Sequence, residues 1–423
     1  MRRNIALLCF GLMIYPLLAE TDSTAVDSAK PFPEKMKARE PWEQVLALPG
    51  AVINLPFKLT MEAVSHTAGY VFIPGQLGPI YDLLHSDDGL RSLMPTASSR
   101  SGVGLKYTHK DFLKTGAKLQ IKAMLGLRFR QKYQLTLKRL PVVPGKVYSD
   151  ISIAYRRLVD ESYFGLGNQS IYDNRSSYAQ EKTLAEMNLN VDPIRKVNLS
   201  LGFNYHLNSV YDGKNSEVPI ITQQFDPAYV PGLESGIQMA GVRVGAVYDN
   251  VTVNINHTRG FECALFGDYV NEISGSQFGF WKVGLDMTQH VHLFYGRGLK
   301  LRFAAEVTEP LENKRIPFYF LSEIGPMETM RGFRRGRYRD LDMFLGSVEY
   351  AYPIWHRMGT WLDAVVFVDA GKVTHDITEN FSSDYLSNTF GGGFKLFHNN
   401  EGLGMFLIGK SDDGIQFYLT FNI

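Results

Sequence analysis

The chain has 423 residues, and its 44 Lys and Arg nearly balance its 43 Asp and Glu, for a formal net charge of +1. A charge so close to zero argues against a nucleic-acid partner. Aromatic residues make up 13% of the chain and Gly numbers 39, yet beyond the N-terminus no apolar run reaches the length of about 18 residues that a membrane-spanning helix needs.

Residues 1–19 have the pattern of a secretory signal peptide: two arginines, then an almost wholly apolar stretch that ends in a small residue, Ala19. We expect cleavage after Ala19. Cys9 lies inside the apolar stretch with bulky residues before it, so the pattern of a lipid-anchored cysteine is absent. Cleavage would leave Cys263 as the single cysteine, and no intramolecular disulfide is expected.

Residues 20–98 differ in composition from the rest of the chain. Residues 21–41 are polar, charged and Pro-containing, which is typical of a flexible linker. Residues 42–84 show a helix-like spacing of apolar residues that prolines interrupt. The apolar residues that could line one side of short amphipathic helices are Trp42, Val45, Leu46, Val52, Ile53, Phe57, Met61 and Val64. We expect a lid or plug packed against the following domain; the alternative is a periplasmic or interfacial docking helix.

From about Ser101 onward the apolar residues recur with a period of two, the period of a strand with one apolar face. One example is the alternation of Leu119, Ile121, Ala123 and Leu125 with Lys118, Gln120 and Lys122. A soluble sandwich alternates in the same way, but the long strands and the recurrence to the C-terminus favour an all-β, transmembrane antiparallel β-barrel over residues 99–423. At roughly 20 residues per strand and loop, we expect about 16 strands.

The final strand has the cleanest alternation, with Ile415, Phe417, Leu419, Phe421 and Ile423 on one face. A polar residue, a Gly and then large apolar residues at alternate places resemble the insertion signal that outer-membrane assembly machinery reads. The residues of this signal are Asp412, Gly414, Phe417, Leu419 and Phe421, and the departure is Ile423, where Phe is usual.

Two segments carry a family resemblance. From Ile316 the chain reads IPFYFLSEIGPMETMRGFRRGRYRDLDMFLGSVEYAYPIW, and from Trp361 it reads WLDAVVFVDAGKV. They resemble the bacterial surface antigen family, the BamA/TamA outer-membrane assembly superfamily. The hallmarks are an R-G-F/Y triplet on a loop that folds inside the barrel, a glutamate-bearing strand, and F-x-D-x-G on a following strand. They correspond to Arg331, Gly332 and Phe333, to Glu349, and to Phe367, Asp369 and Gly371.

Other segments agree with the resemblance, which covers roughly residues 100–423. They are YFGLGN from Tyr163, TRGFECALFGDY from Thr258 and FGGGFKL from Phe390. The second of these holds another R-G-F triplet, starting at Arg259, which we interpret as a structural copy.

The charges of the motif also have a direct physical interpretation. Glu349 and Asp369 both lie between apolar neighbours, so their carboxylates face the lumen if those neighbours face lipid. Arg331 could then pair with both, because a guanidinium is a rigid fork of donors. We expect the loop to plug or brace the pore; the alternative is that these are ordinary lumen charges.

The best-known members of the family carry periplasmic POTRA domains, βααββ units that receive substrate chains. Residues 20–98 could barely hold one and contain helix breakers instead, so the resemblance implies a barrel-only member. We therefore expect a role in outer-membrane biogenesis or substrate passage, with periplasmic partner subunits in place of those domains. The alternative is a passive channel or structural barrel in which the inner loop is only a brace. The other expected partners are outer-membrane lipids and the machinery that inserts the barrel.

No enzyme motif is visible. The chain has no Walker A run and no G-x-S-x-G elbow, which gives a lipid-modifying barrel enzyme little support. His290 and His292 would share one face of a strand, but without a third ligand nearby they favour a polar lumen or interface over a metal site. The basic run from Arg331 to Arg339 alternates with Gly and Tyr and favours a solvated or lumen-lining role. We expect no catalytic residues, no metal and no cofactor.

Overall fold

The computed structural model describes residues 84–421, except residues 99, 216, 255–256, 326, 358–359, 381, 383 and 399–400. The predicted signal peptide, and the linker and amphipathic helices predicted before residue 84, lie outside the described residues. Within the described residues, none of the helices has the length and apolar character needed to cross a membrane.

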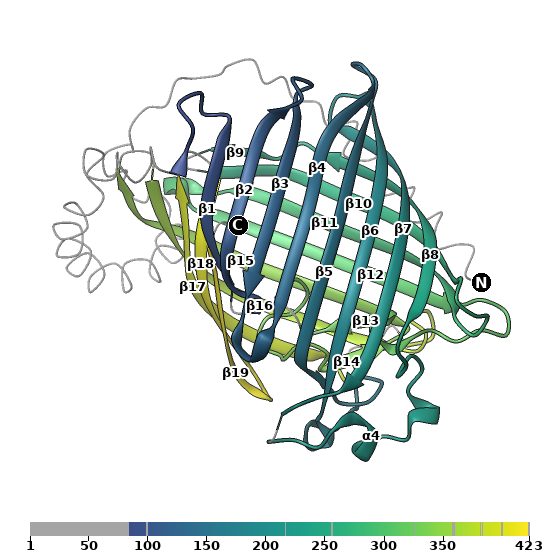
Figure 1. Ribbon diagram of the computed structural model, residues 1–423. Helices are drawn as coiled ribbons and strands as arrows, with labels where there is room; N and C mark the ends of the chain where they lie inside the picture. Colours follow the sequence, from purple (N-terminus) through teal and green to yellow (C-terminus); the bar gives the residue numbers. More distant parts are fainter. Residues whose placement is uncertain are drawn as a thin grey trace, which may run out of the picture.

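Antiparallel strands dominate the described chain (Figure 1). The first half contains β1 (Arg91–Ser98), β2 (Gly102–Phe112), β3 (Ala117–Leu125), β4 (Gln131–Val143), β5 (Val147–Tyr163), β6 (Ser176–Ile194), β7 (Val197–Asp212), β8 (Ile237–Asp249) and β9 (Thr252–Asn254). The second half contains β10 (His257–Glu272), β11 (Gly279–His292), β12 (Gly298–Pro310), β13 (Ser322–Ile324), β14 (Tyr338–Asp340), β15 (Asp342–Arg357), β16 (Thr360–Thr374), β17 (Ser387–His398), β18 (Glu401–Ser411) and β19 (Gly414–Phe421).

The helical elements of the described residues are single turns. They are η2 (Leu127–Phe129), η3 (Tyr172–Asn174), α4 (Ile221–Gln224), η4 (Pro227–Tyr229), η5 (Phe294–Gly296) and η6 (Phe318–Phe320).

Neighbouring strands in sequence pair with each other around the sheet, and β1 pairs with β19 to close it. The short β9 occupies the same place as β8, because both pair with β10. The small sheet of β13 and β14 is separate. The wall is therefore a closed antiparallel barrel of 16 strands, which confirms the predicted fold class and strand number.

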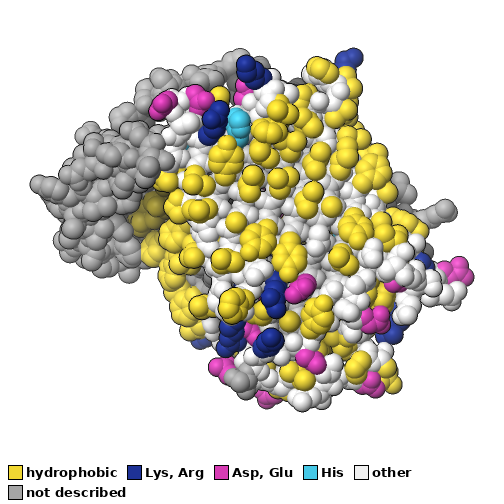
Figure 2. Space-filling model, in the orientation of Figure 1, with side chains coloured by type: hydrophobic (Ala, Val, Ile, Leu, Met, Phe, Trp, Pro, Cys, Tyr) yellow, Lys and Arg dark blue, Asp and Glu magenta, His cyan; other side chains and the backbone are white. Residues whose placement is uncertain are grey.

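The period of two separates the two faces of the wall. On β19, Ile415, Phe417, Leu419 and Phe421 are 42–62% exposed on the outside, while the residues between them are half-buried. Figure 2 shows the resulting broad apolar surface over β1 to β8, with charged side chains mainly toward the two ends. A closed barrel with an apolar exterior satisfies its backbone groups within lipid, so this surface suits the hydrocarbon core of a membrane.

The barrel begins at Arg91, eight residues before the predicted boundary at residue 99, because β1 covers Arg91–Ser98. Pro95 lies inside this strand, and a proline within a short run argues against a strand in sequence analysis. The strand also has few apolar residues, and only Leu93 and Pro95 among them are exposed.

The two ends of the barrel differ in their connections. At one end the turns are short, as between β4 and β5 or β6 and β7. The other end carries the long connections 164–175, 213–236, 311–341 and 375–386, and it is the lower end in Figure 1. Three clusters of buried apolar side chains include residues of segment 311–341, so a packed core fills the barrel toward this end.

Candidate functional site

The connection between β12 and β15, residues 311–341, forms what we call the inner loop. Its β13 and β14 pair with each other, and its Met330 and Phe333 are buried in one cluster with Leu345 of β15 and Val373 of β16. Phe333 also makes an edge-to-face contact with Tyr338 of the loop, at 5.3 Å between ring centroids. The loop therefore folds against the inner wall rather than extending away from the barrel.

Arg331 joins the inner loop to two carboxylates of the wall. Its Nε and Nη2 donate to Asp369 on β16 at 2.9 and 2.6 Å, and its backbone N–H donates to the same carboxylate at 3.0 Å. Its Nη1 donates to Glu349 on β15 at 2.5 Å. All three residues are buried, with Asp369 0% exposed. The guanidinium therefore makes the double pairing that its fork of donors permits.

The rest of the F-x-D-x-G motif shapes this contact. The guanidinium carbon of Arg331 lies 3.6 Å from the ring centroid of Phe367, a cation–π geometry. Ser347 accepts from Arg331 Nη2 at 2.9 Å and donates to Asp369 at 2.6 Å. Gly371 leaves room for β15, since an added Cβ would lie 2.8 Å from the carbonyl oxygen of Phe344.

Burial alone would lower the pKa of Arg331. The hydrogen bonds and charges of Asp369 and Glu349 outweigh it and hold the pKa above the ordinary arginine value. Arg331 therefore stays charged. Its ion pairs with Asp369 and Glu349 are buried, so solvent screens them little.

Gly332 places the tip of the loop on the last two strands. Its φ of +106° is rare for L side chains, and an added Cβ would lie 3.1 Å from Thr389. Its N–H donates to the hydroxyl of Tyr418 on β19 at 2.8 Å, and its carbonyl accepts from Ser411 on β18 at 2.8 Å. A glycine is therefore required in the middle of the triplet.

Two further arginines anchor the loop through partners that the sequence analysis did not anticipate. Arg337 donates to Asp413, in the β18–β19 turn, at 2.5 Å and to Ser170, in the Gly-rich segment after β5, at 2.8 Å. Arg339 donates to Glu323 of β13 at 2.8 Å and to Tyr178 of β6 at 3.1 Å. The basic run from Arg331 to Arg339 was expected to be either solvated or lumen-lining. Arg337 and Arg339 are both buried, so these two residues line the lumen.

Lys395 of β17 is a second cation on Glu349 that the sequence analysis did not anticipate, and its Nζ is in direct contact with that carboxylate. Strand alternation alone could have suggested that Lys395 faces the lumen. Its partner depends on the register between β15, β16 and β17, which the sequence does not give.

The β1–β19 pairing, which we call the seam, is the shortest pairing between neighbouring barrel strands in the part of the chain that the structure describes. Among the described residues β1 pairs with β19 only at Ala97–Phe421 and Ser98–Thr420, whereas it pairs with β2 along its whole length. β19 pairs with β18 from Gly414 to Phe421. The part of β19 from Gly414 to Leu419 thus has a backbone edge that β1 does not cover.

Other candidate residues have simpler positions. Asp412 lies in the turn before β19 and Gly414 is the first residue of β19, whose Phe417, Leu419 and Phe421 point outward. His290 and His292 lie on β11, and no group of three or more residues suited to a metal lies together in the part of the chain that the structure describes. Cys263 is buried on β10, and the second R-G-F triplet also lies in β10 rather than on a loop.

A family model described as the Omp85 superfamily domain matches residues 96–407. The chain belongs to the Omp85 superfamily. This confirms the resemblance to the BamA/TamA superfamily, and it places the chain among outer-membrane barrels and not among enzymes. Because such barrels have short periplasmic turns and longer outer loops, the end with the long connections faces outward.

Solved structures share the fold of this Omp85 barrel at low sequence identity. BamA from Haemophilus ducreyi lacking POTRA domains 1–3 has a TM-score of 0.55 and 18% identity, over 77% of this chain and 68% of that one. CdiB from Escherichia coli has a TM-score of 0.54 and 12% identity, over 77% of this chain and 61% of that one. A comparison with curated protein sequences found no match.

Proposed function

We propose that this Omp85 barrel acts in outer-membrane biogenesis or substrate passage, together with periplasmic partner subunits. The observation that carries the proposal is the seam, where the described residues pair at two register positions in a wall that elsewhere pairs over many. A backbone edge without a strand partner is a template for another strand. The edge of β19 from Gly414 to Leu419 offers such a template to a substrate chain that enters from the lumen or the membrane.

The inner loop supports this proposal. Its attachment to β15 and β16 through Arg331, and to β18 and β19 through Gly332, keeps the loop beside the seam without using the edge of β19 that β1 leaves uncovered. We infer that the loop braces the wall where β19 has its only long pairing, with β18. The seam can then open while the remaining strands keep their register.

A disulfide across the seam tests the proposal. Cysteines replace Ser98 and Thr420, which are Cα partners, in a chain that also carries Cys263→Ser. In the control, cysteines replace Gln120 of β3 and Thr136 of β4, which are Cα partners within a long strand pairing away from the seam. In cells that depend on this protein, oxidation of the seam pair should lower the levels of other outer-membrane proteins, and a reductant should restore them. Normal levels with the seam pair fully oxidised would contradict the proposal.

The second candidate is a passive channel in which the inner loop is only a brace. The many buried contacts of the loop favour it, because they suit a fixed constriction as well as an assembly device. Planar-bilayer conductance separates the two. A large, steady pore would support the channel, whereas rare, flickering openings would support a loop-occluded barrel.

A further inference from the structure

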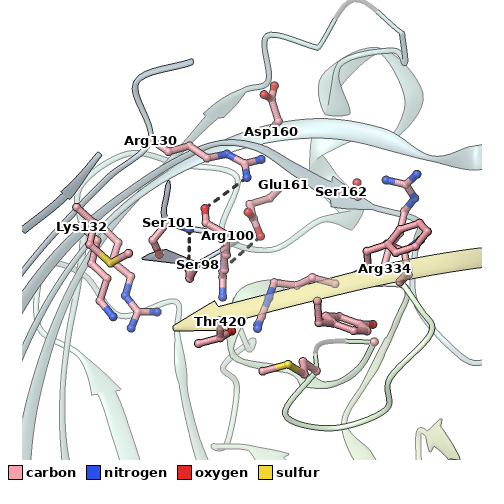
Figure 3. Close-up of a pocket in the computed structure, with 18 of the residues that line it drawn as sticks. Ser98, Arg100, Ser101, Arg130, Lys132, Asp160, Glu161, Ser162, Arg334 and Thr420 are labelled. Carbon is pink, nitrogen blue, oxygen red and sulfur yellow. Dashed lines mark hydrogen bonds and ion pairs between the residues drawn. The ribbon is translucent and has the colours of Figure 1, made fainter. Parts of the chain in front are cut away.

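A cavity of about 620 Å³ lies at the outward end of the seam, between the β1–β2 and β3–β4 turns, β5, the inner loop and β19 (Figure 3). Among the described residues that line it, nine are Arg or Lys and four are Asp or Glu. Arg100, Arg130, Lys132 and Arg334 lie around one common space in Figure 3. The cavity therefore has an excess of positive charge, although the whole chain is nearly neutral.

The carboxylates of the cavity neutralise only part of its cations. Asp160 pairs with Arg128 at 2.7 Å, Glu161 with Arg100 at 3.4 Å and Glu328 with Arg335 at 2.9 Å. Within the described part of the chain, Lys122, Lys132 and Arg156 have no ion pair and no side-chain hydrogen bond.

The strand register places like charges opposite each other. Lys132 of β4 is the cross-strand partner of Arg156 of β5, which in turn is the partner of Lys182 of β6. Like charges directly opposite on neighbouring strands are destabilising. The buried polar atoms of the cavity without a partner among the described residues are Thr96 Oγ1, Arg100 Nε and Asp160 Oδ1. A bound anion would offset the repulsion between the cations and accept hydrogen bonds from Thr96 and Arg100, although it would leave Asp160 Oδ1 as it is.

The surroundings of the cavity indicate an amphiphilic ligand. In the β3–β4 turn, Leu127 and Phe129 are 89% and 79% exposed. Arg128 lies between them in sequence and Arg130 follows them, and both arginines line the cavity. Apolar side chains at the rim with arginines among them match the boundary between acyl chains and headgroups.

The cavity also reaches the membrane-facing side of the wall. Phe417 and Phe421 line it, although both point outward on β19 and are 62% and 47% exposed. This follows from the seam, where the described residues of β1 do not pair with the outer part of β19. A headgroup in the cavity could thus keep its acyl chains in the membrane, which a closed wall would prevent.

We propose that this cavity binds the phosphate-bearing headgroup of a lipid in the outer leaflet. Arginine and lysine supply charge-assisted hydrogen bonds to phosphate oxygens, with Arg156 and Lys132 free to do so and Arg100 offering an unused Nε. The exposed Leu127 and Phe129 contact the acyl chains. This site is independent of whether the barrel assembles other proteins.

The test compares two lipids that differ only by a phosphate. The barrel is placed in dodecyl maltoside micelles, which contain no phosphate, with either phosphatidic acid or diacylglycerol, and retained lipid is counted by native mass spectrometry. The wild type should retain phosphatidic acid and not diacylglycerol. The double variant Lys132→Gln, Arg156→Gln should bind phosphatidic acid at least about tenfold more weakly, since each cation near a membrane surface attracts anionic lipid appreciably. Lys300→Gln on β12, a cation of the wall that does not line the cavity, should bind as the wild type does.

Each other outcome has a defined meaning. Equal retention of phosphatidic acid by the double variant and the wild type would overturn the proposal. Displacement of the lipid by inorganic phosphate at similar concentrations would assign the cavity to free phosphate, and displacement by a polyglutamate peptide would assign it to a protein ligand. If the double variant failed to fold, Lys132→Gln alone would replace it, and weaker binding of phosphatidic acid by this variant would support the proposal. Binding by the wild type should also weaken as the salt concentration rises, and binding that is independent of salt would overturn the proposal.

Discussion

Arg331 donates three hydrogen bonds to Asp369, one from its backbone N–H and two from its guanidinium, so the main chain and the side chain of the inner loop share one carboxylate of β16. Asp369 is fully buried and also accepts from Ser347. The contact thus fixes both the position and the direction of the loop at this residue. Loss of this contact should destabilise the inner loop more than the wall, because backbone hydrogen bonds between neighbouring strands hold the wall together.

Replacing Arg331 by Ala should release the inner loop without unfolding the barrel. Removal of one partner from a buried ion pair typically costs about 3–5 kcal/mol, and only 10% of the Arg331 side chain is exposed. We expect higher conductance and faster proteolysis between Arg334 and Arg339, with unchanged strand content by circular dichroism. Arg331→Lys keeps the charge but not the fork of donors, so its defect should be intermediate.

Arg259 gives the matched control for Arg331, since it heads the second R-G-F triplet but lies in β10. Arg259→Ala should leave conductance and proteolysis as in the wild type. If Arg331→Ala behaved in the same way as Arg259→Ala, the loop would not depend on the ion pairs.

Glu323 should make the attachment of the inner loop sensitive to acid. Burial alone would raise its pKa, but Arg339 and Arg335 hold the pKa below the ordinary glutamate value. A lowered folded-state pKa means that the stabilisation is fully present above the unfolded value of about 4.3 and is lost as the pH falls through the lower folded value. Hydrogen exchange of residues 322–340, corrected for the intrinsic rate, should therefore accelerate below about pH 4.

Glu323→Gln is the matched variant for this pH dependence. It leaves Arg339 buried with a neutral partner, so exchange in the loop should be faster at neutral pH and should change less with acid. A variant with the same pH profile as the wild type would assign the acid response to another carboxylate.

The outward face of β19 should be necessary for insertion. Replacing Phe417 and Leu419 by Asp should reduce the level of the protein in the outer membrane severely, because these residues form the predicted insertion signal and face lipid. Gln416→Asp, on the half-buried face of the same strand, is the control and should insert normally. Membrane fractionation and immunoblotting measure both. Equal membrane levels would place the signal elsewhere.

The purified protein should be heat-modifiable. A closed barrel satisfies its backbone groups internally and resists detergent, so the unheated sample should migrate faster on a gel than the boiled one. Because the described residues of β1 and β19 pair at two register positions, the unheated form should convert at a lower temperature than a form locked by an oxidised disulfide between positions 98 and 420. The conversion temperature of the two forms, measured side by side, checks this. Identical temperatures would mean that the seam does not limit opening.

The sequence predicted the barrel because lipid imposes a strict period of two on each strand, which is visible in residues such as Phe417 and Leu419. It also predicted which side of the wall Asp369 and Glu349 occupy, since alternation decides that locally. β1 was harder to recognise because Pro95 interrupts it and because its pairing with β19 joins opposite ends of the chain.

The contacts of Arg337 and the charge of the seam cavity could not be predicted from the sequence. Arg337 contacts Asp413 and Ser170, which are far apart in the chain and meet only when the barrel closes. The opposition of Lys132 and Arg156 depends on the register between β4 and β5, and this register is shifted by irregularities nearer the β4–β5 turn. Periodicity gives the face of a residue but not its neighbour on the next strand.

The inner loop lies within the barrel, with its tip on β19, and a photo-cross-link from Tyr418 tests this placement most directly. The hydroxyl of Tyr418 accepts from the Gly332 N–H at 2.8 Å, and its replacement by benzoylphenylalanine leaves Arg331, Glu349 and Asp369 intact. After irradiation of intact outer membranes, mass spectrometry of the digest should find position 418 linked to the loop peptide that contains Gly332 and Phe333. Links only to lipid or to neighbouring strands, in a protein that is inserted and heat-modifiable, would show that the loop does not occupy the lumen.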